Sequence, residues 1–373
     1  MLSLLAAIAF GLHLPGAVAQ EISPRGDAPT SASARAMSDA LSGYQFQFAA
    51  MGTQVELQAF HADRQQVAAA FQQAQQRVTE LAAILTDYDP HSETRQLTPR
   101  AVDAFVPVSD PLWQMLVASQ RWHELSNGAF DASLGQLTQL WRKYRRSTRL
   151  PTPEEIALAR EHTGWQHVQL DNQQQRVRLG DPQLRLDFGA IGKGFVVDQA
   201  FDLLQQHGLD RVLVNISGNM RVGLPPPERS GWRIEIAPLE PGGQPLRRIE
   251  LCQAAIATSG DLWQYVTIDG VRHSHVLDPR TGLGVVGPLC ATVISPLATD
   301  ADALATTACV AGFAAAQKIA QQLGATHVLV ARRVADSSPS TTARSARENN
   351  SSAASPGPIH LDETPGFPAS LAE

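Results

Sequence analysis

The residues with the clearest chemical potential stand around a glycine-rich loop at residues 187–194. Asp187 comes before its glycines, and Lys193 stands between the last two of them. Alternating apolar residues at 184–188 predict a strand before the loop, helical spacing predicts a helix that ends at Gly208, and residues 211–216 predict a second strand. Glycines at a helix N-terminus place backbone N–H groups where they favour an anion. The loop therefore predicts a phosphate site flanked by Asp187 and Lys193.

Two common phosphate motifs do not fit this loop. The glycines read G-x-x-G-x-G, which differs from the dinucleotide fingerprint G-x-G-x-x-G. A Walker A loop needs a glycine and a hydroxyl at the positions where Asp187 and Gly194 stand. A tight strand-to-helix turn with a solvated Lys193 remains the alternative interpretation.

A second candidate pair is Asp302 and Thr306, within a helix expected from residue 298 to Gly312. The spacing of four places both side chains on one helical face. A carboxylate and a hydroxyl are hard oxygen ligands, which suit magnesium with water and phosphate completing its coordination. The alternative is structural: Asp302 would interact with the helix dipole, and Thr306 would bond to its own backbone.

His275 lies in an expected strand that leads to a tight Asp-Pro turn, and it is a candidate general base near neutral pH. His273 would share its face of the strand, a spacing that zinc could use, but no third soft ligand has a matching position. Tyr88 stands in a polar loop after a helix. It is either an aromatic platform for a planar ligand or a residue packed at the helix end.

The remaining elements must position these residues, and the length and composition of residues 43–334 are enough for one large domain or for two intimately joined halves. The 373 residues are 43% hydrophobic and carry a net charge of −6 without a long basic run, which argues against a nucleic-acid partner. The three cysteines have no C-x-x-C spacing and give no disulfide framework. The basic residues of the cluster at 142–149 are interpreted as a solvated face; they are Arg142, Lys143, Arg145, Arg146 and Arg149.

The pattern along the chain predicts a strand or hairpin at 44–60, interrupted at 50–53, and helices at 65–85, 111–126, 151–162 and 317–323. Strands or hairpins are expected at 168–170, 176–179, 233–237, 247–252, 265–268, 291–295 and 326–331. The Ser/Ala-rich stretch at 335–358 is predicted to be disordered, and residues 359–373 to form a terminal strand or tail.

The N-terminal residues 1–19 are apolar and end in Ala17-Val18-Ala19, which predicts a secretory signal peptide cleaved after Ala19. The protein is then expected in the periplasm, with at most peripheral association with the inner membrane. A retained membrane anchor is the alternative, although the stretch is short and interrupted. Residues 20–42 are expected to be flexible.

Several motifs in this order resemble one family, the ApbE-type FAD:protein FMN transferases. They begin with 50-AMGT-53, LTDYDPHSE at 85–93, GAFD at 128–131 leading to Trp141, and LDFGAIGKGFVVD at 186–198. They continue with LVNISG at 213–218, ATSGD at 257–261, SHVLDPRTG at 274–282 and ADALAT at 301–306. No single piece is specific, but eight in order make coincidence implausible. Three departures concern loop geometry: Phe188-Gly189, Gly192, and Ser217 in place of a glycine.

The resemblance implies an α+β fold related to the T-fold, with mixed sheets, packed helices and two intimately joined halves. It implies an enzyme that splits FAD and attaches FMN through a phosphoester to a Thr or Ser of an acceptor protein, releasing AMP. The residues that would contact FAD are Met51, Tyr88, Ala129, Phe130, Asp131, Asp187, Lys193 and Leu277. Magnesium, or manganese, would be held by the Ala190 carbonyl with Asp302 and Thr306, and His275 would be the base for the acceptor hydroxyl.

Tyr88 and Phe130 are the side chains expected near the isoalloxazine or adenine ring. The acceptor would be a protein such as a subunit of a membrane redox complex, and the sequence does not identify it. Two other functions use the same residues: a periplasmic protein that binds and delivers FAD without transferring FMN, and a metal-dependent FAD pyrophosphatase. The presence of Asp302, Thr306 and His275 together favours catalysis, because a carrier needs no base.

Overall fold

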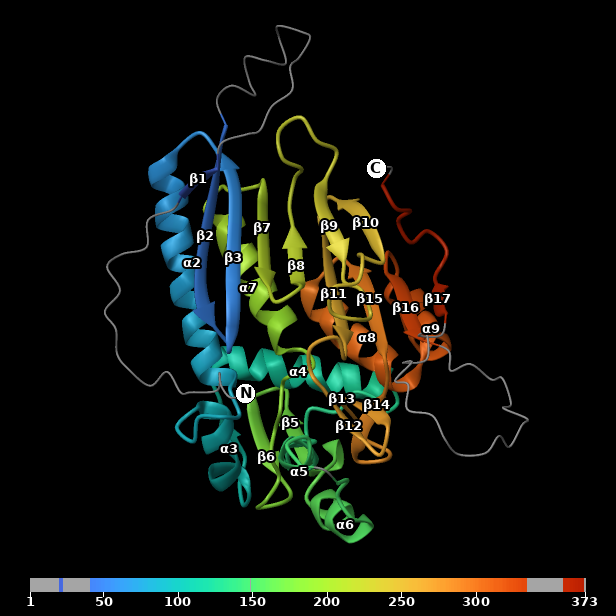
Figure 1. The fold of residues 1–373 in the computed structure, drawn as a ribbon. Helices are drawn as coiled ribbons and strands as arrows, with labels where there is room; N and C mark the ends of the chain where they lie inside the picture. Colours follow the sequence, from blue (N-terminus) through green and yellow to red (C-terminus); the bar gives the residue numbers. More distant parts are fainter. Residues whose placement is uncertain (1–19, 23–40, 148, 334–357, 372–373) are drawn as a thin grey trace, which may run out of the picture.

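A nine-stranded sheet organises the fold in the computed structural model, which describes residues 20–22, 41–147, 149–333 and 358–371 (Figure 1). Every pairing between neighbouring strands of this sheet is antiparallel. In spatial order the strands are β1 (Gln20–Ile22), β2 (Ser42–Ala50), β3 (Thr53–His61), β7 (Val212–Ile216), β8 (Asn219–Val222), β11 (Ala254–Gly260), β15 (Leu289–Ser295), β16 (His327–Arg333) and β17 (Ile359–Glu363).

Helices cover one face of the sheet, and a small two-stranded ribbon packs on part of the other (Figure 1). The helices are α2 (Arg64–Leu85), α7 (Gly192–Gln206), α8 (Ala298–Ala311) and α9 (Phe313–Leu323), and the ribbon is β9 (Trp232–Ile236) with β10 (Arg247–Leu251). Strand β15 shows the consequence, because all of its residues are buried. Ala291 and Val293 pack toward the helices, whereas Cys290 and Ile294 pack with the ribbon. The α+β class expected from the sequence is confirmed.

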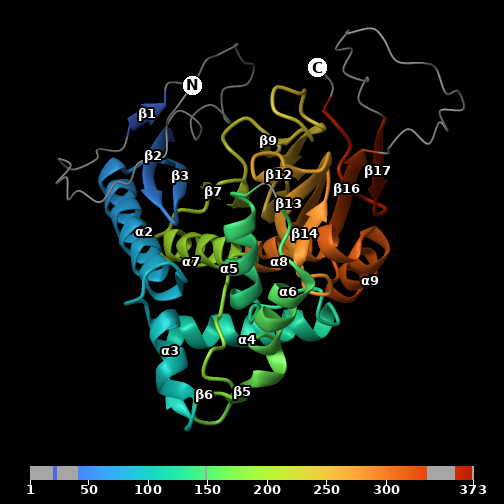
Figure 2. The ribbon, with the colours of Figure 1, turned by 60° about the horizontal axis from the view of Figure 1, so that its bottom comes forward.

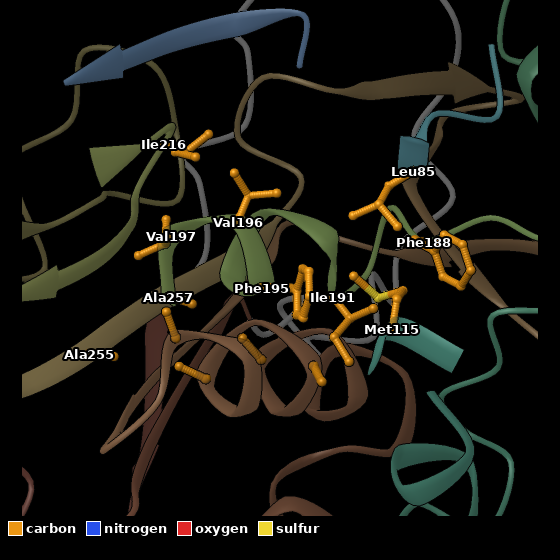
Figure 3. Packing of buried hydrophobic residues seen from close by; sticks show 14 of the residues in the cluster. Leu85, Met115, Phe188, Ile191, Phe195, Val196, Val197, Ile216, Ala255 and Ala257 are labelled. Carbon is orange, nitrogen blue, oxygen red and sulfur yellow. The ribbon is translucent and has the colours of Figure 1, made fainter. Parts of the chain in front are cut away.

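Helices α7 and α8 meet where the two halves of the sheet join, and each supplies the N-terminal cap of the other. Neither helix has a capping bond from its own N-cap residue. Asp198 of α7 accepts from the backbone N–H groups of Ala298 (2.9 Å) and Thr299 (2.8 Å), and Asp302 of α8 accepts from Gly194 N–H (2.9 Å). Buried side chains such as Ile191, Phe195 and Ala257 fill the space around this contact (Figure 3). The reciprocal caps fix the relative position of the two helices.

The remaining elements form a base beneath one end of the sheet (Figures 1 and 2). Helix α4 runs across that end, and α5, α6 and two small sheets lie below it. The helices of the base are α3 (Glu93–Ala101), α4 (Asp110–Leu125), α5 (Gly135–Tyr144), α6 (Pro153–Glu161) and the 3-10 turn η1 (Trp165–His167). Its strands are β4 (Val106–Pro107), β5 (Val168–Asp171) and β6 (Arg176–Leu179) in one sheet, and β12 (Tyr265–Ile268), β13 (Val271–Asp278) and β14 (Leu283–Val286) in the other.

The structure departs from the sequence-based expectations in a few elements. The strand expected at 184–188 is an extended segment with a single parallel bridge, between Arg185 and Leu134. Helices α3 and α5 were not predicted. Residues 20–22, expected to be flexible, form strand β1. The expected signal peptide at 1–19 and almost all of the insertion expected at 335–358 lie outside the described residues. Within the described part of the chain, no helix has the length and apolar character needed to cross a bilayer.

Candidate functional site

A cavity of about 1200 Å³ opens between the end of the sheet and the base, and every site residue expected from the sequence lines it. These residues are Met51, Tyr88, Ala129, Phe130, Asp131, Asp187, Ala190, Lys193, His275, Leu277, Asp302 and Thr306. They come from segments spread over about 250 positions of the chain. A cavity of this size is large enough for a dinucleotide.

Two tight hairpin turns bring backbone to the cavity. Met51 and Gly52 join β2 to β3, and Ser217 and Gly218 join β7 to β8. All four residues have positive φ, between 52° and 87°, which is typical of two-residue hairpin turns. A left-handed conformation costs a non-glycine residue about 1 kcal/mol, so Met51 and Ser217 are held against a local preference. Ser217, which departs from the family pattern, therefore keeps the turn that a glycine would make.

Arg142 of α5 ties together two carboxylates and an aromatic ring of the cavity wall. Its guanidinium lies 2.6 Å from Asp87 Oδ2 and 2.8 Å from Asp187 Oδ2, and 4.5 Å from the centre of the Tyr88 ring. Burial together with the charge of Asp187 raises the pKa of Asp87, while the two carboxylates raise the pKa of Arg142 against the effect of its own burial. Tyr88 is 75% exposed, so its ring is open to a planar ligand. This favours the platform interpretation of Tyr88 over packing at a helix end.

The segment 129–131 follows α4, after Gly128 turns the chain with a φ of 79°. Phe130 is only 2% exposed and belongs to the hydrophobic core. Its ring is therefore not an open platform, although Phe130 lines the cavity as expected and stays a predicted FAD contact. Asp131 accepts from Ser133 N–H at 2.7 Å, which fixes its carboxylate at the cavity wall. Leu277 is likewise buried and offers the cavity an apolar surface.

Oxygen atoms gather where α7 and α8 meet. Asp302 is 2% exposed and uses Oδ2 to cap α7, and no donor among the described residues reaches its Oδ1. Thr306 shares a hydrogen bond of 2.9 Å with Ser259 rather than bonding its own backbone. Ala190 lines the cavity in the loop that enters α7. The structural alternative is thus correct in part. Asp302 does stabilise a helix N-terminus, but that of α7 rather than of its own helix, and Thr306 does not bond its own backbone.

These donors fit magnesium by their chemistry. Carboxylate, hydroxyl and carbonyl oxygens are the ligands that a hard cation takes, and magnesium keeps several waters rather than needing a full protein cage. No cluster of three histidine, cysteine, aspartate or glutamate side chains suited to a metal occurs in the described ranges. The zinc alternative at His273 and His275 therefore lacks ligands here, and the oxygen set at Asp302 is the candidate metal site.

A bulge in β13 separates the two histidines. The pairing of β13 with β14 shifts register between His273 and Leu277. His273 is buried against Trp141, with ring centroids 5.8 Å apart, while His275 is exposed and lines the cavity. The expectation that they share one face of the strand is wrong, because the irregular stretch between His273 and Leu277 interrupts the strict alternation.

His275 is held in a form that suits a base. Its Nδ1 lies 3.3 Å from the carbonyl oxygen of Gln264, which can only accept, so this contact favours the tautomer with a free Nε2. Protein packed around the ring, together with the positive charges of Arg145 and Lys193, lowers the pKa of His275. The side chain is also exposed to the cavity, and this exposure moderates the size of the shift. The imidazole is therefore neutral at neutral pH and able to accept a proton.

Sequence reasoning missed Arg142 and Arg145 as cavity residues. Both line the cavity, whereas Lys143, Arg146 and Arg149 are exposed as expected of a solvated face. Helix register could have separated them. Arg142 and Arg145 are three residues apart, so they lie on one face of the helical turn that follows the buried Trp141. A cluster of basic residues without a predicted helix gave no register with which to separate them.

Comparison with known proteins adds independent support. Two FAD:protein FMN transferases are each 32% identical to this chain, that of Klebsiella pneumoniae (strain 342) over 224 residues and that of Vibrio cholerae serotype O1 over 235. The matches cover 58% and 61% of this chain, and 64% and 69% of those proteins. The chain thus aligns with slightly less than two thirds of the Klebsiella protein.

Solved structures show the same fold. The flavin transferase ApbE from Vibrio cholerae superimposes with a TM-score of 0.70 at 26% identity, covering 79% of this chain and 95% of that one. The apo form of the Pseudomonas stutzeri flavinyl transferase ApbE gives a TM-score of 0.70 at 28% identity, with coverages of 79% and 92%. The ApbE family model itself matches residues 51–330, a range that contains every residue expected at the cavity. The chain belongs to the ApbE family.

Proposed function

We propose that this protein is a FAD:protein FMN transferase, which moves FMN from FAD to a Thr or Ser hydroxyl of an acceptor protein. The observation that carries the proposal is the convergence, in one cavity, of oxygen atoms suited to a hard metal ion, a lysine at a helix N-terminus and a neutral histidine. The names of the relatives support the same reaction. A protein that only binds FAD could use the lysine and the metal site for the diphosphate, but it would need no base.

In the proposed reaction the acceptor hydroxyl oxygen attacks the phosphorus of the FMN half of FAD. The new P–O bond to the acceptor forms as the bond from that phosphorus to the AMP oxygen breaks, and AMP leaves. Nε2 of His275 takes the proton of the hydroxyl, since Nδ1 faces the Gln264 carbonyl. The products are the FMN phosphoester of the acceptor, AMP and one proton.

Phosphoryl transfer is catalysed mainly by holding the reacting groups and neutralising charge. Lys193 stands in the first turn of α7 and lines the cavity, where the helix N-terminus adds its own positive potential. Both would act on the diphosphate oxygens. Magnesium held by Asp302, Thr306 and the Ala190 carbonyl would supply further neutralisation of the diphosphate; manganese has the same oxygen ligands.

Asp302 gives the first test of this assignment. Asp302→Ala is expected to abolish FMN transfer, because it removes the only carboxylate that we place at the metal site. Asp302→Asn is the matched variant: its amide oxygen can still cap α7 through Gly194, but it is a much weaker ligand for magnesium. Full transfer activity in the folded Asn variant would refute the metal assignment.

The function itself is tested by mixing the protein with FAD, magnesium and a periplasmic acceptor domain that carries a flavinylation sequence. We expect flavin fluorescence that stays with the acceptor on a denaturing gel and that is lost with a chelator. Release of FMN and AMP without a labelled acceptor would instead indicate a pyrophosphatase. FAD that remains bound and intact would indicate a delivery protein.

We further propose that the protein works in the periplasm, at most peripherally associated with the inner membrane. The basis is the signal-like sequence at residues 1–19, which lies outside the described part of the structure. The acceptor would then be a periplasmic domain, such as one in a membrane redox complex. Cell fractionation with an antibody to the protein tests this location.

A further inference from the structure

Two arginines enter the cavity from the C-terminal end of α5, and only one of them is neutralised. Arg142 forms ion pairs with Asp87 and Asp187. Arg145 has no carboxylate partner among the described residues, and its one side-chain contact is with Gln264 Oε1, at 3.4 Å. Its Nε is buried without a hydrogen-bond acceptor. Arg145 therefore presents a positive charge to the cavity that the protein itself does not balance.

The position of Arg145 is fixed by the packing of α5 against β13. Trp141 donates from Nε1 to the Ser274 carbonyl at 2.9 Å, and Arg145 N–H bonds back to the Trp141 carbonyl at 2.8 Å. Gln264 also accepts from His275 N–H at 2.9 Å, so the residue that contacts Arg145 is bonded to the backbone of His275. This links the guanidinium to the strand that carries the proposed base.

The electrostatics place Arg145 on the reacting part of the cavity. Arg145 and Lys193 are the two cations that lower the pKa of His275. Burial, with Arg142 and Arg146 nearby, lowers the pKa of Arg145 itself, although a guanidinium stays protonated at any working pH. Lys193 belongs to α7 and Arg145 follows α5, so the two charges reach the cavity from separate elements. Two cations that act on the same part of the cavity attract an anionic ligand to that part.

We propose that Arg145 binds the diphosphate oxygens of FAD, together with Lys193. This inference rests on the proposed function, and it adds a ligand contact from a helix whose basic residues suggested only a solvated face. A guanidinium matches two phosphate oxygens with a bidentate pair of hydrogen bonds, which an ammonium group cannot do. Arg145 would thus hold the reacting phosphorus close to His275 and stabilise negative charge that grows during transfer.

The diphosphate is a better assignment than an acidic side chain of the acceptor. The acceptor hydroxyl must approach His275, and Arg145 lies beside that residue through Gln264. The phosphorus under attack must lie next to that same hydroxyl. Its oxygens are then the anionic groups that come closest to Arg145, whatever sequence surrounds the acceptor residue.

The experiment compares the binding of FAD, ADP and riboflavin by calorimetry, with the full chain and with magnesium present. Arg145→Gln is expected to weaken FAD and ADP binding about tenfold or more, the usual loss for a hydrogen bond to a charged group. Riboflavin, which has no phosphate, should bind as before. Arg145→Lys keeps the positive charge but cannot form the bidentate pair of hydrogen bonds. Its affinity for FAD and ADP should lie between those of wild type and Arg145→Gln.

Arg146→Gln is the matched control, because it removes the same charge one residue away, where the side chain is exposed and outside the cavity. It should bind all three ligands as wild type does. Thermal unfolding of each variant shows whether it is folded. If Arg145→Gln does not fold, the binding comparison is made with Arg145→Lys.

Three results would overturn the role of Arg145. Unchanged FAD and ADP affinity in Arg145→Gln would exclude contact with the diphosphate, and a raised KM for the acceptor would then assign Arg145 to acceptor recognition. An equal loss for riboflavin would place the guanidinium at the flavin ring. Failure of the wild-type protein to bind FAD would instead overturn the proposed function, and with it the premise of this inference.

Discussion

At the scale of single residues, side chains of the same type have different roles because of a difference of one position. Arg145 lines the cavity, while its neighbour Arg146 is exposed. The resemblance identified residues that match motifs, and the structure places all of them at the cavity. It could not identify Arg142 or Arg145, because their function depends on helix register and on which carboxylates lie near, and neither is visible in residue types.

The pH dependence of transfer tests His275. Its pKa is lowered in the folded protein by desolvation and by Arg145 and Lys193, so the neutral base should persist well below pH 6.5, the ordinary histidine pKa. As pH falls, kcat/KM should drop only when His275 becomes protonated, with a midpoint below 6.5. The measurement is the pH profile of kcat/KM for FMN transfer.

His275→Gln provides the comparison. The variant should lose about 100-fold or more in kcat at pH 7, as expected on removal of a general base, with FAD affinity largely kept. It should also lose the acid limb of the profile. An acid limb that is identical in wild type and His275→Gln would assign the titration to another group and contradict the proposed role of His275.

At the scale of elements, apolar periodicity predicted which side chains are buried more reliably than it predicted which segments pair as strands. Leu184, Leu186 and Phe188 alternate and are all nearly fully buried, as expected of a strand. Among the described residues the segment nevertheless has only one bridge, from Arg185 to Leu134, and it is not part of a named strand. Alternation reports which side chains face the core, whereas a ladder needs a partner that comes from elsewhere in the sequence.

The contact of α7 with α8 depends on Gly194. A Cβ atom at this position would lie 2.2 Å from the Ala298 carbonyl oxygen and 2.8 Å from Asp302 Cβ, so the helices could not keep their approach. Gly194→Ala should lower the free energy of unfolding by about 2 kcal/mol or more, as overpacking does. Chemical denaturation without ligand measures this change.

Gly192→Ala is the matched control two residues earlier. A Cβ atom there would meet its nearest neighbours at 3.6 Å and 4.0 Å, which is ordinary contact. This variant should be unchanged or more stable by about 0.5 kcal/mol, since alanine restricts the unfolded chain. Equal destabilisation of both variants would show that the approach of α7 to α8 is not what requires glycine.

At the scale of the whole molecule, the site exists because two halves of one sheet are joined. Met51, Ser217 and Asp302 come from different parts of the chain and meet at one end of the sheet. The sequence predicted most of the strands, including the last one near Ile359. It could not predict their order in the sheet. For example, residues 334–357 separate β16 from β17 in the sequence, and residue types do not show that the two strands pair.

The C-terminal segment, residues 358–371, adds the edge strand β17 beside β16 and packs on the β9–β10 ribbon. Phe367 is 7% exposed and packs in the cluster that contains Trp232 and Ile249. Arg247 of β10 lies 5.3 Å from the Phe367 ring centre and donates to the Pro368 carbonyl at 3.0 Å. Phe367 is thus part of the core on the face of the sheet opposite the helices.

Phe367→Ala should therefore lower the free energy of unfolding by about 3 kcal/mol, the usual cost of removing a buried aromatic ring. Leu361→Ala is the control from the same segment: Leu361 is 40% exposed on β17, and its loss should cost less than about 1 kcal/mol. Both values come from denaturant unfolding of the full chain without ligand. If Phe367→Ala cost no more than Leu361→Ala, the packing of Phe367 on the β9–β10 ribbon would not stabilise the fold.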